Sequence, residues 1–230
     1  MYTLPNNTCW GVNDSQGDLL AWGSCGLIAH ATASAVAVYS LEEESIYLLR
    51  SWEYGDKRIT ALGWCDGSFS NQRPIPILAL GLDDGFIVLV DISLLKEVGT
   101  FILEEDIPKT IKWSLTDMFT FFVGTQNGRF YELQYLSQNT PTVVEIQWTI
   151  LNYPIEFILL DGYPNSSPLE FSSDGTGQYV FDNSDTVFSL LEFLQLEPPI
   201  IRVEYYPQSQ NCLMVLTNQC YFFYSLEARC

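Results

Sequence analysis

Three apolar segments of this chain end in tryptophan, and their spacing is the feature that most limits the possible folds. Trp22, Trp64 and Trp113 follow one another at intervals of 42 and 49 residues. After each tryptophan come an extended apolar run, a tight turn and a second extended run. The turns of the second and third units end at Gly85 and Gly128, 43 residues apart. A short-strand unit of this length cannot bury both faces alone and has to stack on similar neighbours.

The repeat predicts an all-β propeller of about five four-stranded blades, as a closed or an incomplete ring. Apolar residues make up 47% of the chain and aromatic residues 14%, enough for a large core in one domain over residues 1–230. The expected blades cover residues 19–50, 58–103, 109–148, 155–194 and 200–226. Trp22, Trp64 and Trp113 should be buried at equivalent positions between neighbouring blades, as its structural core.

The last two units follow the pattern less clearly. Residues 186–194 can form an outer strand, although 188–196 could also form a short amphipathic helix. The fifth unit stops after an extended run over 221–225, with no fourth strand to follow. An unpaired aromatic strand of this kind promotes aggregation. We therefore expect an open or strained ring whose edge is covered by another protein.

The composition argues against two classes of binding. The formal net charge is −18, from 28 acidic and 10 basic residues. Nucleic-acid binding needs clustered positive charge, and the densest basic spot here is Lys57-Arg58. The apolar runs are far shorter than a membrane-spanning helix requires. We expect no direct nucleic-acid binding and no membrane insertion.

The ends and the cysteines indicate a compartment. The first residues have neither a basic start nor an apolar core, so we expect no signal peptide. The six cysteines form no Cys-x-x-Cys pair, and most of them are next to apolar strand residues. Buried free thiols in a reducing compartment, the cytoplasm or the nucleus, explain this pattern best.

Motifs for catalysis are missing from the sequence. His30, the only histidine, is in an apolar run of small residues, which favours a structural role. A zinc site needs about four closely spaced Cys or His ligands, and a phosphate site needs a Gly-rich loop. Neither pattern occurs, so we expect no catalytic residues, no cofactor and no metal.

The enzymatic alternative is a self-contained five-bladed propeller with ligand-binding or glycosidase activity. Glycoside hydrolysis there would need two carboxylates at a fixed separation around a central pocket. The candidate aspartates near predicted strand ends are Asp66, Asp91, Asp117, Asp161 and Asp182. Aspartates at strand ends ordinarily form turns, and this alternative therefore stays second.

Acidic residues concentrate in the segments that a propeller would present on one face. These segments join neighbouring blades or link the second and third strands of a blade. Their acids are Glu53, Asp56, Asp83, Asp84, Glu104, Glu105, Asp106 and Asp174, against the basic Lys57, Arg58 and Lys109. The face can be an ordinary solvated surface. It can also be the docking surface for a basic segment of a partner protein, since complementary charge steers encounter.

The second unit resembles a blade of the WD-repeat propellers. Residues 76–91 look like the second strand, turn and third strand of that family, and Val90-Asp91 stands where its Trp-Asp pair would be. Residues 26–39 look like the opening blade of scaffolds such as Elongator subunit 2 or the propeller subunits of transcription factor IIIC. The resemblance covers residues 19–148 well and 155–226 poorly.

This resemblance implies a non-catalytic protein-interaction scaffold, a subunit of a larger multiprotein assembly. The chain departs from the family because it has no Gly-His pair before a first strand and no Trp-Asp dipeptide. The buried hydrogen-bond network that those residues build is therefore expected to be absent, so that packing alone holds the blades. A further possibility is that the chain is one part of a longer propeller.

Overall fold

The computed structural model describes the backbone of most of the chain. The described residues are 19–23, 26–42, 45–65, 76–114, 117, 119–136, 142–150, 155–159, 169–173, 179–183, 186–189, 200–206, 209–217 and 221–225. All regular structure among them is β-strand, in five separate antiparallel sheets. Side chains are described for residues 19–23, 26–40, 46–65, 76–114, 117, 119–136, 158, 221 and 223.

Each sheet is a meander in which consecutive strands pair. The first contains β1 (Leu20–Trp22), β2 (Leu27–Thr32), β3 (Ala35–Glu42) and β4 (Ser45–Glu53). The second contains β5 (Ile59–Trp64), β6 (Ile77–Leu82), β7 (Phe86–Asp91) and β8 (Lys96–Ile102). The third contains β9 (Pro108–Trp113), β10 (Thr120–Thr125), β11 (Arg129–Leu136) and β12 (Thr142–Ile150).

The two remaining sheets follow the same order. The fourth contains β13 (Ile155–Leu159), β14 (Leu169–Ser173), β15 (Tyr179–Asn183) and β16 (Thr186–Ser189). The fifth contains β17 (Ile200–Tyr206), β18 (Ser209–Thr217) and β19 (Tyr221–Ser225), so within the described residues it has three strands. The helix considered over 188–196 is wrong at its start, because 186–189 is a strand; residues 190–196 lie outside the described part.

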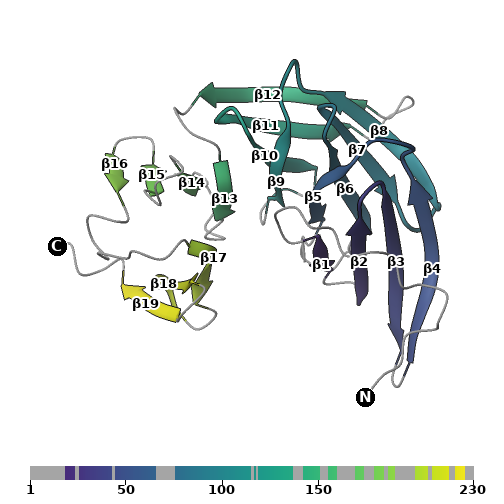
Figure 1. Cartoon of the computed structure of the whole chain (residues 1–230), viewed down its shortest axis with the longest axis horizontal. Helices are drawn as coiled ribbons and strands as arrows, with labels where there is room; N and C mark the ends of the chain where they lie inside the picture. The colour runs from purple at the N-terminus through teal and green to yellow at the C-terminus, as the bar shows by residue number, and fades with distance from the viewer. Residues whose placement is uncertain are drawn as a thin grey trace.

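The five sheets form an open β-propeller. Figure 1 shows them following one another around an arc, with the first sheet and the last in different lobes. The first strand of each sheet faces the inside of the arc: β5 lies against β1 and β9, and β13 lies against β9 and β17. The prediction of an all-β propeller with about five blades and an open ring is confirmed.

The core consists of apolar layers between neighbouring sheets. Strand β6 is buried on both faces, because Leu78 and Leu80 pack toward the first sheet while Ile77 and Ala79 pack toward the third. This explains its continuous apolar sequence, since a strand covered on both sides has no face that selects polar residues. Between the third and fourth sheets, Phe122 and Phe130 stack and pack with Ile158 of β13.

The three tryptophans do not share one environment. Trp64 and Trp113 are 5% and 3% exposed, whereas Trp22 is 65% exposed. The expectation that Trp22 is buried is therefore wrong. Trp22 is in the first sheet, and no earlier sheet covers it within the described residues.

Candidate interaction face

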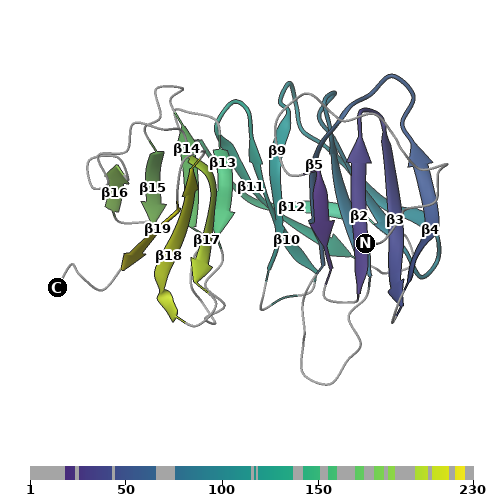
Figure 2. The same ribbon diagram turned by 60° about the horizontal axis from the view of Figure 1, so that its bottom comes forward.

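Turns within blades and loops between blades are joined by backbone hydrogen bonds. The Ile59 N–H donates to the Ala33 carbonyl, and the Leu103 N–H donates to the Gly85 carbonyl. The Gln126 N–H likewise donates to the Ile107 carbonyl at 2.8 Å. Figure 2 shows these turns and loops on one side of the sheets. We call this surface, formed by residues 33–34, 53–58, 83–85, 103–107 and 126–128, the loop face.

Two of the acidic residues of the loop face are used inside the fold. The Asp83 carboxylate accepts a hydrogen bond from the Arg58 N–H at 2.9 Å. The Asp84 carboxylate accepts one from the Phe86 N–H and forms an ion pair with Lys57. The Lys57 ammonium also lies over the Phe86 ring, 4.5 Å from its centroid. These contacts hold the hairpin turn of the second blade against the preceding loop.

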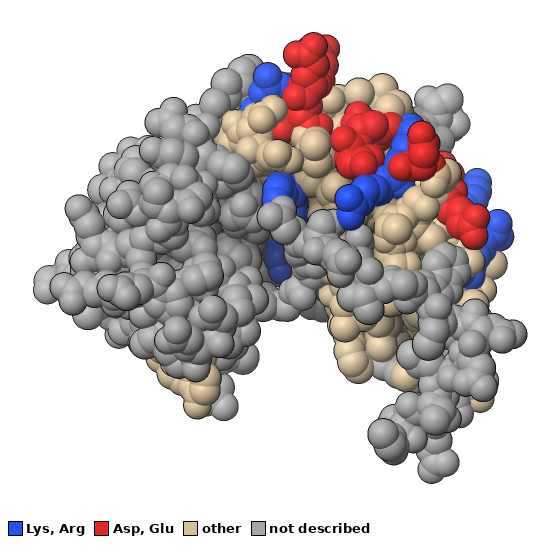
Figure 3. Space-filling view, in the orientation of Figure 1, with Lys and Arg blue, Asp and Glu red and all other residues tan. Residues whose placement is uncertain are grey.

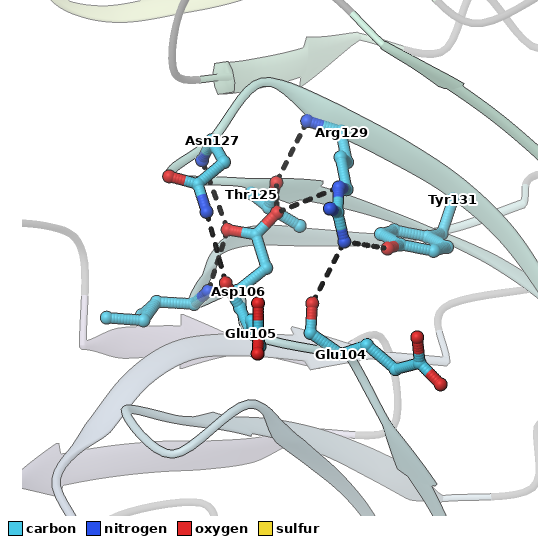
Figure 4. Close-up of polar contacts among 8 residues, drawn as sticks. Glu104, Glu105, Asp106, Thr125, Asn127, Arg129 and Tyr131 are labelled. Carbon is cyan, nitrogen blue, oxygen red and sulfur yellow. Dashed lines mark hydrogen bonds and ion pairs between the residues drawn. The ribbon is translucent and has the colours of Figure 1, made fainter.

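The buried carboxylate of Asp106 is the centre of a polar network (Figure 4). Its side chain is fully buried and accepts hydrogen bonds from the Thr125 hydroxyl at 2.6 Å and from the Asn127 N–H at 3.1 Å. The Ile107 N–H is a third donor, at 2.8 Å. Three donors compensate the cost of burying this carboxylate. Asp106 is therefore a structural residue, and its assignment to a partner-binding surface is wrong.

Arg129 completes this network from the start of β11. Its guanidinium Nε lies 4.0 Å from the Asp106 carboxylate, and its Nη1 donates to the Glu104 carbonyl at 2.9 Å. The hydrogen bond to the Tyr131 hydroxyl, together with the nearby acids, raises the pKa of Arg129. Asp106 thus ties the loop after β8 to β10 and β11.

The expectation that packing alone holds the blades is wrong at this junction. Asp106, Thr125, Asn127 and Arg129 build a polar network around the buried Asp106 carboxylate, without the Gly-His and Trp-Asp pairs of WD-repeat proteins. The sequence contains one signal for it, an Asn-Gly turn next to a threonine and an arginine. The partner of that turn, Asp106, lies 19 residues from Thr125 along the chain and could not be paired with it from sequence.

Four exposed carboxylates remain on the loop face. Among the described residues, the side chains of Glu53, Asp56, Glu104 and Glu105 form no hydrogen bond or ion pair. Figure 3 shows acidic and basic side chains intermixed over this part of the molecule. The free acidic surface is therefore smaller than the sequence predicts. Asp174, the eighth acid of the set, lies outside the described residues.

The two candidate glycosidase residues with described side chains, Asp91 and Asp117, make local contacts. Asp91 accepts the Leu94 N–H at 3.1 Å, and Asp117 accepts the Phe119 N–H at 2.9 Å and the Thr120 hydroxyl at 2.7 Å. Both are turn-forming contacts. Asp66 and Asp161 lie outside the described residues, and the Asp182 side chain is not described either.

Other residues singled out by sequence have ordinary places. His30 is half-buried in β2, opposite Leu20 of β1 and Ala37 of β3. Cys65 is buried and forms no disulfide. Within the described residues, no cluster of His, Cys, Asp or Glu could hold a metal ion. The same residues include no helix long and apolar enough to cross a membrane.

Comparison with known proteins identifies a fold and no family. No protein-family model matches the sequence, and no curated protein matches it. A chain of the solved "Crystal Structure of Mitotic Checkpoint Complex" matches 94% of this chain with a TM-score of 0.68 and 15% sequence identity. The likeness shows the fold alone. The match covers 62% of that neighbour, so this chain spans less than two thirds of its length.

Proposed function

We propose that this chain is a divergent WD-repeat propeller that acts as a non-catalytic scaffold in a multiprotein assembly. Its loop face binds a basic segment of a partner protein. The observation that carries this proposal is the group of exposed carboxylates at Glu53, Asp56, Glu104 and Glu105. Glu53 ends β4, and the other three lie in two consecutive loops between blades, which backbone hydrogen bonds and the Asp106 network fix in place. A rigid surface binds a partner at a lower entropic cost than a mobile one.

A direct test uses charge reversal and a labelled Lys-rich nonapeptide as the probe. Glu104→Lys changes the loop face, and the matched control Glu97→Lys changes an equally charged, exposed residue on β8. Both variants alter the net charge by the same amount. We expect Glu104→Lys to weaken binding several-fold and to reduce its salt dependence, because exposed charge pairs contribute roughly 0.2–1 kcal/mol each. Glu97→Lys should have a clearly smaller effect.

Equal weakening by the two variants would mean that the peptide follows only the net charge of −18, which contradicts the proposal. Cross-linking of the native assembly provides a second measurement. Contacts are expected at residues 53–56 and 104–105. Contacts found only at residues 67–73 and 136–141 would assign the partner to another surface.

A further inference from the structure

The interface between neighbouring blades contains a repeated hydrogen bond from tryptophan. The Trp64 indole N–H donates to the Ala21 carbonyl at 3.0 Å, and the Trp113 indole N–H donates to the Gly63 carbonyl at 3.0 Å. The two acceptors lie one residue before a tryptophan of the earlier blade: Ala21 before Trp22, and Gly63 before Trp64. The interface therefore has a direction: the earlier blade contributes a carbonyl and the later blade an indole.

The first sheet carries the donor half of this interface, and no described sheet packs against that side of it. Trp22 occupies the same position in β1 as Trp64 in β5, and within the described residues its indole has no acceptor. Leu20 and Trp22 are 59% and 65% exposed. Alternation along a strand places both on one face, while Ala21 packs toward the second sheet. Ile28 and His30, directly across on β2, extend this face and are half-buried.

The last sheet has an exposed aromatic face at the other end of the arc. Tyr221 and Phe223 of β19 are 63% and 55% exposed, and their rings form an edge-to-face pair with centroids 5.8 Å apart. Tyr221 and Phe223 are two positions apart in β19, so their side chains lie on the same face of the sheet. Figure 1 places β1 and β19 in different lobes of the open arc. Large exposed apolar side chains at such a position mark an interaction surface.

We propose that a second copy of this chain occupies the exposed face of the first sheet, through its own last sheet. The face at Leu20 and Trp22 continues a series of interfaces in which a preceding sheet supplies a backbone carbonyl. The chain's last sheet, at β19, exposes an apolar face with no sheet beyond it in the described residues. Two copies joined in this way bury Leu20 and Trp22 of one copy against Tyr221 and Phe223 of the other. This contact is separate from the loop face.

The contact is end to end, so each added copy leaves one exposed face at either end. Such heterologous contacts extend beyond dimers unless the geometry closes a ring. The net charge of −18 on every copy opposes assembly at low ionic strength. Because the contact itself is apolar, salt should strengthen self-association by screening this repulsion.

Two exposed substitutions block the two ends separately. Leu20→Arg places a charge on the first sheet and Phe223→Arg on the last, and the matched control Leu94→Arg changes a residue that is 58% exposed in the turn after β7. By sedimentation velocity, the wild type and Leu94→Arg should form concentration-dependent oligomers. Leu20→Arg and Phe223→Arg should each weaken self-association at least about tenfold, because each would bury an unpaired charge in the interface between copies. Each variant should therefore sediment as a monomer at concentrations where the wild type forms oligomers. Folding is checked by the thermal unfolding of each variant.

Mixing the two blocked variants provides the decisive measurement. Each retains one intact end, so an equimolar mixture should form dimers and nothing larger. A Phe223→Arg protein that dimerises alone would indicate contact between two first sheets. That result overturns the proposal, as does a mixture that stays monomeric or a wild type that is monomeric at all concentrations.

Trp22→Phe tests the hydrogen bond specifically. Phenylalanine keeps an aromatic ring but has no N–H donor. We expect association to weaken about fivefold, since a net hydrogen bond contributes roughly 1 kcal/mol. Unchanged association would remove the basis for placing a sheet with a carbonyl acceptor on this face, and would overturn the proposal.

Discussion

At the scale of single residues, position decides what tryptophan contributes. Trp64 and Trp113 are buried and donate their indole N–H across a blade interface, while Trp22 is largely exposed. The sequence shows that the tryptophans repeat, but it does not show that Trp22 is exposed while the other two are buried. The environment of Trp22 depends on what packs before the first sheet. Asp106 shows the same limit: its role depends on Thr125, a partner distant in sequence.

Trp64→Ala should reduce the free energy of unfolding by about 3–5 kcal/mol, through lost burial and a cavity between the first two sheets. The indole hydrogen bond to Ala21 is also lost. At protein concentrations low enough for the chain to be monomeric, the control Trp22→Ala should cost no more than about 1 kcal/mol, since most of that side chain is then in water. Urea unfolding of the two variants measures both values. Equal losses would contradict the assigned environments.

Glu132 should make stability depend on pH. Burial, followed by the charge of Asp117, raises the pKa of Glu132 in the folded chain above its value of about 4.3 in the unfolded chain. Between the unfolded and the folded pKa of Glu132, the folded state binds more protons than the unfolded state. The free energy of unfolding therefore falls as the pH rises from the lower pKa to the higher one. Glu132→Gln should flatten that part of the curve of unfolding free energy against pH. Identical curves for wild type and Glu132→Gln would contradict the prediction.

At the scale of elements, the strands of the first three blades are predictable from sequence because each one carries its own local signal. Short apolar runs separated by Gly, Asn and Asp specify strand and turn without distant partners. The fourth blade has fewer such signals, so its outer segment could be read from the sequence as a strand or as a helix. The loops between blades have no comparable signal, since their conformation is set by the turns that they contact.

A substitution at Gly85 would measure how tightly this turn packs against the loop over residues 103–106. Gly85 has a φ of 87°, and a Cβ there would lie 2.7 Å from the Leu103 carbonyl oxygen and 2.8 Å from that of Asp106. Gly26 has a similar φ of 76° with open space around the Cβ position. Gly26→Ala should therefore cost only the backbone strain, about 1–2 kcal/mol, and Gly85→Ala clearly more. Equal losses in urea unfolding would show that the loop moves aside freely.

At the scale of the whole molecule, repulsion between like charges opposes folding. With a net charge of −18, self-repulsion destabilises the compact state. The thermal midpoint should rise when salt is raised from about 0.01 M to 0.1 M, where the screening length falls from about 30 Å to 10 Å, and should change little at higher salt. NaCl and KCl should act equally, because screening depends on ionic strength. A response to only one cation would indicate specific ion binding instead.

The direction of the indole hydrogen bonds has a consequence for biosynthesis. Ala21 and Gly63 are translated before the tryptophans that bond to them. When the second or the third blade leaves the ribosome, the blade that carries the acceptor carbonyl for its tryptophan has already been synthesised. The reverse polarity would leave every new indole unpaired until the next forty residues had been made. The direction of these hydrogen bonds therefore matches the order in which the blades are synthesised.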